Sequence, residues 1–186
     1  LRLKGERLSH IWFMTFQNNE REPLIITDGA LNIKPSLETK KSIITNVINF
    51  TSKIKDFDPK IAILSATEEI LDQMESSSDA DKLMDWSKKS FPDQKIFGPL
   101  AFDNAISTDA ALIKGISNPV AGNANVIIVP NIETGNSLVK IMVNFMNSIA
   151  GGFIVGGKVP VVITSRSDNV ESRLSSISNA ILSIDR

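Results

Sequence analysis

The residues best suited to chemistry gather where residues 159–164, a run of strand-forming side chains, give way to a helical pattern. Ser165 and Arg166 stand in that turn. Asp168 and Glu171 follow at the spacing of a capping box, in which Asp168 accepts from backbone amides and Glu171 reaches back. Free amides and the positive helix end attract anions, and a guanidinium fork suits phosphate. The turn predicts a phosphate site, although capping also explains both carboxylates and many exposed arginines are simply solvated.

Polar or turn-forming residues also follow two other strand-like runs, at 24–27 and 126–129, and a further set lies in residues 98–105. They are Asp28, Asp103, Asn104, Pro130, Gly135 and Asn136. Gly135 would let a backbone approach a ligand closely, and Asn136 can cap a helix. Asp103 can serve as a base, a ligand or a cap. Substrate binding and local turn chemistry both remain open for this set.

Composition excludes several kinds of site. The 186 residues contain no cysteine and one histidine, His10, so thiolate chemistry, a histidine metal cluster and a conventional Ser-His-Asp triad are not expected. We assign His10 a structural role and predict no metal site. Twenty basic residues balance 21 acidic ones, which offers no broad basic field for nucleic acid. No apolar run approaches the roughly 18 residues of a membrane span, so we expect no membrane insertion.

The elements that must position these residues alternate between strands and helices. Short β-branched runs, several of them continuously apolar, recur between amphipathic patterns at residues 37–54, 136–149 and 170–184. Shorter helices are predicted at residues 79–89 and 103–114. This order predicts a three-layer αβα architecture with a mostly parallel sheet and ligands at the carboxyl ends of its strands. No internal domain boundary is evident, and the start at Leu1 suggests a piece of a longer chain.

Four blocks of the sequence are recognisable as a set. They read TDGALNIKPSLETK at 27–40, GPLAFDNAI at 98–106, VAGNANVIIVPNIETGNSLVK at 120–140 and VPVVITSRSD at 159–168. In this order they resemble the phosphate acetyltransferase and butyryltransferase family, with a closer likeness to the butyryltransferases. Two positions depart from that likeness: Phe97 stands where an aspartate is common, and Gly29 where an alanine is usual.

The resemblance implies a two-domain fold like that of the isocitrate and isopropylmalate dehydrogenases, an active site in the cleft between domains, and a homodimer. A cytoplasmic location is expected because the chain has no cysteine. This chain would be the C-terminal major part of such an enzyme. The implied reaction converts acyl-CoA and phosphate into acyl phosphate and coenzyme A, with coenzyme A as a substrate and no bound cofactor. The resemblance places Ser165 and Arg166 in the active site and leaves the base open between Glu171 and Asp168.

Two rival interpretations keep the same fold. One is a noncatalytic descendant that binds coenzyme A or a protein. The other is a metal-dependent decarboxylating dehydrogenase, which would need converging carboxylates that the sequence does not display. Acyl chain length cannot be predicted from these residues, because one methylene changes binding by only about 1 to 3 kcal/mol.

Overall fold

The structure, a computed structural model, describes residues 7–16, 22–166 and 168–184. The chain divides into two compact units. Unit one comprises Leu1–Phe57 and Asn131–Arg186, and unit two comprises Asp58–Pro130. Unit two is therefore one continuous segment, and unit one is made of the two segments that flank it.

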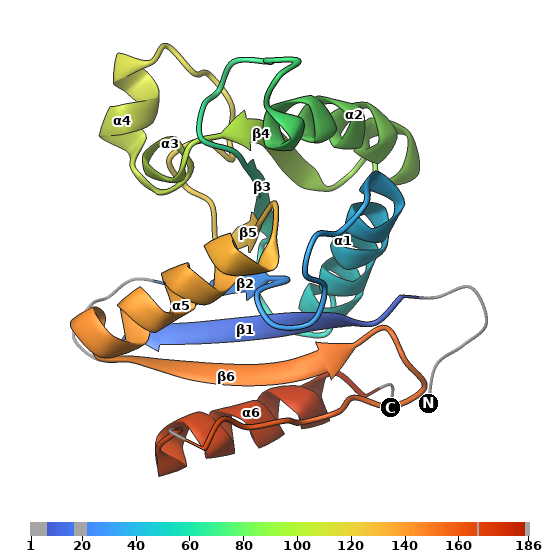
Figure 1. Ribbon diagram of the computed structural model, residues 1–186, viewed down its shortest axis with the longest axis vertical. Helices are drawn as coiled ribbons and strands as arrows, with labels where there is room; N and C mark the ends of the chain where they lie inside the picture. The colour runs from blue at the N-terminus through green and yellow to red at the C-terminus, as the bar shows by residue number, and fades with distance from the viewer. Residues whose placement is uncertain (1–6, 17–21, 167, 185–186) are drawn as a thin grey trace. The chain divides into compact units, whose positions relative to one another are not determined.

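Unit one contains three strands and three helices. The strands are β1 (Ser9–Phe16), β2 (Leu24–Thr27) and β6 (Ser148–Val155), and the helices are α1 (Leu37–Thr51), α5 (Ile132–Met146) and α6 (Val170–Leu182). Strand β1 lies in the middle and pairs antiparallel with both β2 and β6. Phe13 and Phe153 of the sheet both contact Phe50 of α1. Helices α5 and α6 lie on either side of β1 and β6 (Figure 1), so the sheet has helices on both faces.

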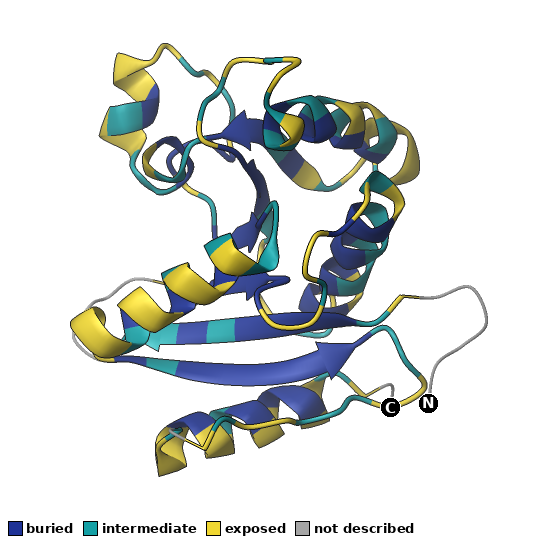
Figure 2. Cartoon of the chain, viewed as in Figure 1, coloured by how far each residue is buried: buried dark blue, intermediate teal, exposed yellow. Residues whose placement is uncertain are grey.

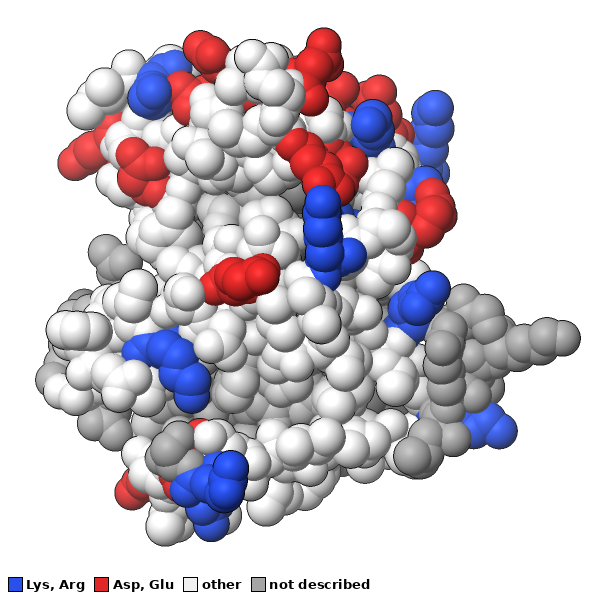
Figure 3. All heavy atoms as spheres, viewed as in Figure 1, with Lys and Arg blue, Asp and Glu red and all other residues white. Residues whose placement is uncertain are grey.

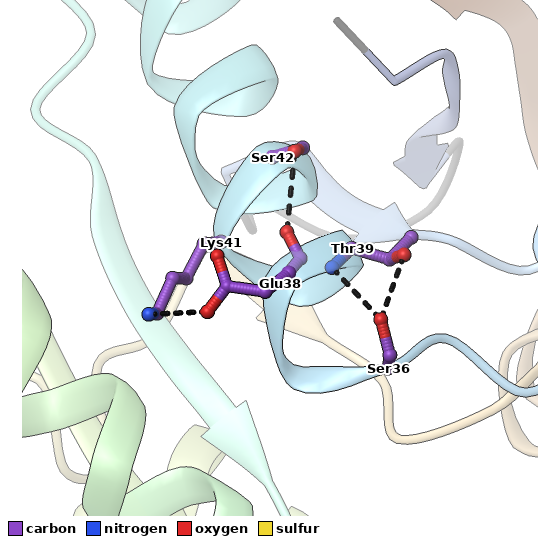
Figure 4. Close-up of polar contacts among 5 residues, drawn as sticks. All are labelled: Ser36, Glu38, Thr39, Lys41 and Ser42. Atoms are coloured by element: carbon purple, nitrogen blue, oxygen red, sulfur yellow. Dashed lines mark hydrogen bonds and ion pairs between the residues drawn. The ribbon is translucent and has the colours of Figure 1, made fainter. Parts of the chain in front are cut away.

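Helix α1 begins as its sequence predicts. Ser36 caps it, since its hydroxyl accepts from the Thr39 amide at 3.3 Å. Glu38 in the first turn favours the helix dipole and pairs with Lys41 at 2.7 Å (Figure 4). The apolar positions of α1 face the core, where Ile43, Ile44 and Val47 are fully buried.

Unit two is built on a parallel sheet. Its strands are β3 (Lys60–Leu64), β4 (Lys95–Leu100) and β5 (Val126–Ile128), in the order β4-β3-β5, and its helices are α2 (Glu75–Ser90), α3 (Phe102–Ile106) and α4 (Thr108–Ile113). The continuously apolar β3 and β5 are buried, as expected for strands covered on both faces. Among the described residues the pairing is mixed: β3 pairs parallel with β4 and β5, as predicted, whereas β1 pairs antiparallel with both β2 and β6.

Two predicted helices differ from the observed ones. Helix α5 begins at Ile132, four residues before the predicted start, because Asn131 rather than Asn136 is its cap: the Asn131 side chain accepts from the Thr134 amide at 2.9 Å. The predicted helix at 103–114 is divided into α3 and α4 at Ser107, whose extended backbone ends one helix while its hydroxyl caps the next.

The predicted strand at 159–164 is not formed. Only Val161 makes a bridge, to Ile154 of β6, and Ile163 is 63% exposed. The β-branched composition of this run is typical of a strand, but within the described residues it has no neighbour beyond that one bridge. Sequence propensity therefore overstates the local structure here.

Helix α6 presents its apolar stripe to solvent. Five large apolar residues of the stripe are at least half exposed: Val170, Leu174, Ile177, Ile181 and Ile184. The buried face is made of Ser172, Ser176, Asn179 and Ala180 (Figure 2). A Cβ on Gly151 would come within 2.8 Å of the Asn179 amide nitrogen, so a bare strand backbone lets this small-residue face approach β6. The sequence predicts the amphipathic stripe itself, and the contact with β6 decides which face of the helix is buried.

No helix in the described part of the chain is long and apolar enough to cross a membrane. Basic and acidic side chains occur together on the face shown in Figure 3, which carries no continuous basic field. This distribution agrees with the near-neutral formal charge of -1.

Candidate functional site

The turn before α6 is closed by hydrogen bonds between its own residues. The Asp168 carboxylate accepts from the Ser165 amide at 2.7 Å, and the Asp168 amide donates to the Ser165 carbonyl at 3.2 Å. The helix cap is Asn169, whose side chain accepts from the Ser172 amide at 2.8 Å. The predicted capping box of Asp168 and Glu171 is therefore wrong by one residue, because Asp168 holds the turn and Asn169 caps the helix.

This turn exposes the groups that an anion would meet. The Arg166 side chain is exposed and Ser165 is half-buried, at the positive end of a 13-residue helix. Glu171 is exposed in the first turn of that helix, whereas the Asp168 carboxylate is engaged with the turn. Arg166 and Glu171 are thus the more accessible charged groups of the predicted catalytic set.

Asp28 is a buried carboxylate at the end of β2. One oxygen accepts from the Ala30 and Leu31 amides at 3.0 and 2.8 Å. The other accepts from the His10 amide at 3.0 Å and the Asn32 side chain at 2.6 Å. These four donors occupy the lone pairs of the carboxylate. Asp28 therefore links β1 to the turn after β2, and all four of these hydrogen bonds come from groups of the protein itself.

The turn after β2 packs directly on the first turns of α5. A Cβ on Gly29 would lie 2.8 Å from the Gly135 carbonyl carbon and 3.1 Å from the Asn136 amide nitrogen. The Asn136 side chain also donates to the Gly29 carbonyl at 3.4 Å. This close approach gives a physical reason for glycine at position 29, and it brings Asp28, Gly135 and Asn136 together.

His10 lies in the same part of unit one, and its environment is apolar. The ring lies 4.6 Å from that of Trp12, centroid to centroid, at a tilt of 50°; the residue is 4% exposed, and Nδ1 has no hydrogen-bond partner. Burial lowers the pKa of His10 to about 4, against the opposing attraction of Asp28. The imidazole is therefore neutral near pH 7, which fits the structural role that we expected.

Buried neutral His10 predicts a pH-dependent stability. Its pKa is lower in the folded than in the unfolded protein, so the folded state binds fewer protons, and stability falls as pH drops from about 6.5 toward 4. We expect His10 to contribute a loss of about 2 kcal/mol between pH 7 and pH 5. Urea unfolding at both pH values, compared with the variant His10→Phe, measures it. An equal pH dependence in both proteins would contradict the assignment.

In unit two, Asp103 and Asn104 follow β4 at its carboxyl end. Asp103 is exposed and accepts from the Asn104 amide at 2.9 Å, while the Asn104 side chain is fully buried and donates to Glu68 at 3.1 Å. Glu68 also pairs with Lys114 at 2.9 Å. This contact lowers the pKa of Glu68 and raises the pKa of Lys114. Pro130, half-buried after β5, is the last residue of unit two.

Sequence reasoning missed Glu68 and Lys114. Glu68 comes four residues after the last residue of β3, so a search of every strand's carboxyl end would have included it. Lys114 has no comparable signal, because it ends the short helix α4 and meets Glu68 only in three dimensions.

The predicted site residues of unit one form two separate groups. Asp28 is bonded to His10, which lies opposite Ile154 near the end of β6. Helix α6, which follows Ser165 and Arg166 in the sequence, begins at the same end of the sheet as β6 (Figure 1). The structure joins Asp28 with Gly135 and Asn136 through Gly29, whereas Ser165 and Arg166 belong to the turn that Asp168 closes. Among the residues described, no group of three or more His, Cys, Asp or Glu side chains could hold a metal ion.

The fold is an α/β fold with six strands of mixed pairing, and comparison with known proteins identifies its relatives. The model of the family described as phosphate acetyl/butaryl transferase matches residues 3–181. A phosphate acetyltransferase of Rhizobium meliloti is 41% identical over 177 residues, which are 95% of this chain and 56% of the relative. A phosphate butyryltransferase of Clostridium acetobutylicum is 37% identical over 179 residues, which are 96% of this chain and 59% of the relative.

A solved structure agrees with the sequence comparison. The crystal structure of a branched-chain phosphotransacylase from Enterococcus faecalis V583 superimposes with a TM-score of 0.84 at 38% identity, covering 98% of this chain and 65% of that one. The chain belongs to the phosphate acetyltransferase and butyryltransferase family. It spans a little over half the length of the two relatives named above.

Proposed function

We propose that the protein exchanges a short acyl group between coenzyme A and inorganic phosphate. The observation that carries this proposal is the family match over residues 3–181, reinforced by relatives named as phosphate acetyl- and butyryltransferases along nearly the whole chain. In the forward direction a phosphate oxygen attacks the acyl carbon of the thioester. The carbon–sulfur bond then breaks, which gives acyl phosphate and the thiolate of coenzyme A.

In this proposal Arg166 binds the phosphate. Its exposed guanidinium at the positive end of α6 supports this role, because a planar fork can donate two hydrogen bonds to one phosphate. Ser165, together with amides of the same turn, stabilises the oxyanion in this proposal.

Glu171 is the base that accepts the proton of the coenzyme A thiol. Its exposed position in the first turn of α6 supports this choice over Asp168, whose carboxylate is held by the Ser165 amide. Glu171→Gln should then lower turnover in both directions, because the carboxylate that accepts the thiol proton in one direction returns it in the other. A larger loss in Asp168→Asn than in Glu171→Gln would favour the other carboxylate.

Three finer properties belong to the same proposal: an isocitrate-dehydrogenase-like fold for the whole protein, a homodimer in the cytoplasm, and no bound cofactor beyond coenzyme A as substrate. The exposed apolar stripe of α6 supports self-association, since large apolar patches are typical of interfaces. Sedimentation equilibrium at the mass of one chain would contradict the homodimer.

A thiol-release assay tests the reaction itself. Acyl-CoA and phosphate are mixed with the protein, and free coenzyme A is detected with a chromogenic disulfide. We expect release that requires both substrates and that reverses with acetyl phosphate or butyryl phosphate. Binding of coenzyme A without any release would instead favour a noncatalytic descendant.

A further inference from the structure

The turn that carries Ser165 and Arg166 is supported unequally on its two sides. The chain before it, residues 159–164, is tied to the sheet among the described residues by the one bridge of Val161 to Ile154. The chain after it is α6, a helix of 13 residues that packs along β6. A helix moves as a unit, because hydrogen bonds join its successive turns. The place of Arg166 relative to the sheet therefore depends on how α6 lies on β6.

Burial of apolar side chains does not fix α6 on β6. The large apolar residues of the helix face solvent, and the face on the strand is made of small side chains (Figure 2). Apolar contact is also non-directional, whereas a hydrogen bond requires a particular distance and angle. A hydrogen bond between the small-residue face and the strand would therefore set the position of the helix along β6.

Ser176 makes this hydrogen bond. Its buried hydroxyl accepts from the Gly152 amide of β6 at 2.9 Å and donates to the Ser172 carbonyl of the preceding turn at 2.7 Å. The neighbouring Gly151 lets the two backbones approach, because a Cβ there would meet the Ser175 hydroxyl and lie 3.0 Å from the Ser175 carbonyl carbon. The serine thus ties the strand to the middle of α6 at one register.

We propose that Ser176 is a positioning residue for the phosphate-binding turn. The inference rests on the proposed function, in which Arg166 binds the phosphate, and adds to it a residue in the middle of α6. Ser176 acts through the helix: it fixes α6 on β6, and the first turn of α6 holds the phosphate-binding turn in place. A displacement of about 1 Å in a reacting group can lower a rate by about 10². Loss of this hydrogen bond should therefore impair the use of phosphate.

Steady-state kinetics of Ser176→Ala test this role. The substitution leaves the Gly152 amide without its acceptor and frees α6 to shift on the strand. We expect the KM for phosphate to rise about fivefold or more at fixed acyl-CoA, because the guanidinium of Arg166 no longer lies where phosphate binds. The KM for acyl-CoA, measured at saturating phosphate, should stay within about twofold of that of the unaltered chain.

Ser77→Ala is the matched control. Ser77 is a fully buried serine of unit two with the same two kinds of hydrogen bond: its hydroxyl accepts from the Leu71 amide at 2.9 Å and donates to the Glu69 carbonyl at 2.5 Å. Both variants should unfold at lower urea concentrations than the unaltered chain, because each leaves a backbone amide without its acceptor. Ser77→Ala should keep the KM for phosphate within about twofold. A purely structural role for Ser176 would make the two variants alike.

Gly151→Ala tests the same contact by a different change and replaces Ser176→Ala if that variant does not fold. The added methyl group keeps the Ser176 hydroxyl but pushes α6 away from β6, so the KM for phosphate should again rise. An unchanged KM for phosphate in Ser176→Ala, or in Gly151→Ala where it is the replacement, rejects the positioning role alone. An equal rise in Ser77→Ala also rejects it. No exchange by the unaltered chain contradicts the proposed function and the inference with it.

Discussion

Replacing Arg166 by alanine is expected to lower the exchange rate by about 10² to 10⁴, with the loss concentrated in phosphate dependence. The reason is that the guanidinium supplies the only side-chain cation of the turn at residues 165–168, at a helix end that already attracts anions. Initial rates at varied phosphate and fixed acyl-CoA measure the effect. Arg166→Lys keeps the charge but loses the planar fork, so it should restore only part of the rate.

Arg173→Ala is the control for this prediction, because Arg173 is also exposed and lies further along the same helix. Its removal should leave the phosphate dependence unchanged within about twofold. An Arg166→Ala protein with normal turnover and normal phosphate dependence would remove Arg166 from the mechanism. A loss that is equal in the two variants would indicate a general charge effect of α6.

Replacing Asp28 by alanine is expected to lower the free energy of unfolding by about 3 to 5 kcal/mol. The carboxylate accepts four hydrogen bonds while only 1% exposed, so its loss leaves several buried donors without a partner and opens a cavity. Urea unfolding followed by the fluorescence of the two tryptophans gives the change.

Asp72→Ala serves as the control for Asp28, since Asp72 is exposed and should change stability by less than about 0.5 kcal/mol. Asp28→Asn should be intermediate, because an amide keeps the shape but accepts fewer hydrogen bonds. A change below about 1 kcal/mol in Asp28→Ala would show that the carboxylate is not needed to hold β1 and its turn together.

Local sequence signals predicted the helices and strands whose own apolar pattern matches the face that is buried. The helix predicted at residues 37–54 is confirmed as α1 (Leu37–Thr51), because its apolar spacing matches the face that the structure buries. The buried strands β3 and β5 are confirmed for the same reason, since continuous β-branched runs fit no exposed element as well. In these segments the side chains that indicate a helix or a strand are also the ones that pack in the core.

Sequence patterns did not predict the structure where packing against another segment decides which face is buried or whether a strand forms. Helix α6 has a clear apolar stripe, but its face of small residues packs on β6 at Gly151 instead. Residues 159–164 have strand composition, yet only Val161 finds a partner among the described residues. Neither result can be predicted from the periodicity of apolar residues, because both depend on the segment that packs against the helix or pairs with the strand.

The candidate site was predictable in part for the same reason. Ser165 and Arg166 were found from the helix start, and Asp28, Gly135 and Asn136 from the ends of strands. The spacing did not reveal that Asp28 is saturated by protein donors, nor that Glu68 reaches Asn104 across 36 positions of sequence. Such contacts arise from the fold of each unit and have no local signature.

Arsenate-dependent hydrolysis of acyl-CoA tests the central claim most directly. Arsenate replaces phosphate as the attacking anion, and the acyl arsenate formed decomposes in water, so coenzyme A is released irreversibly. With two-, three- and four-carbon acyl-CoAs, we predict release that saturates with arsenate, is inhibited competitively by phosphate and is lost in Arg166→Ala. Release that is independent of arsenate, or absent with all three thioesters, would contradict exchange of an acyl group between coenzyme A and phosphate.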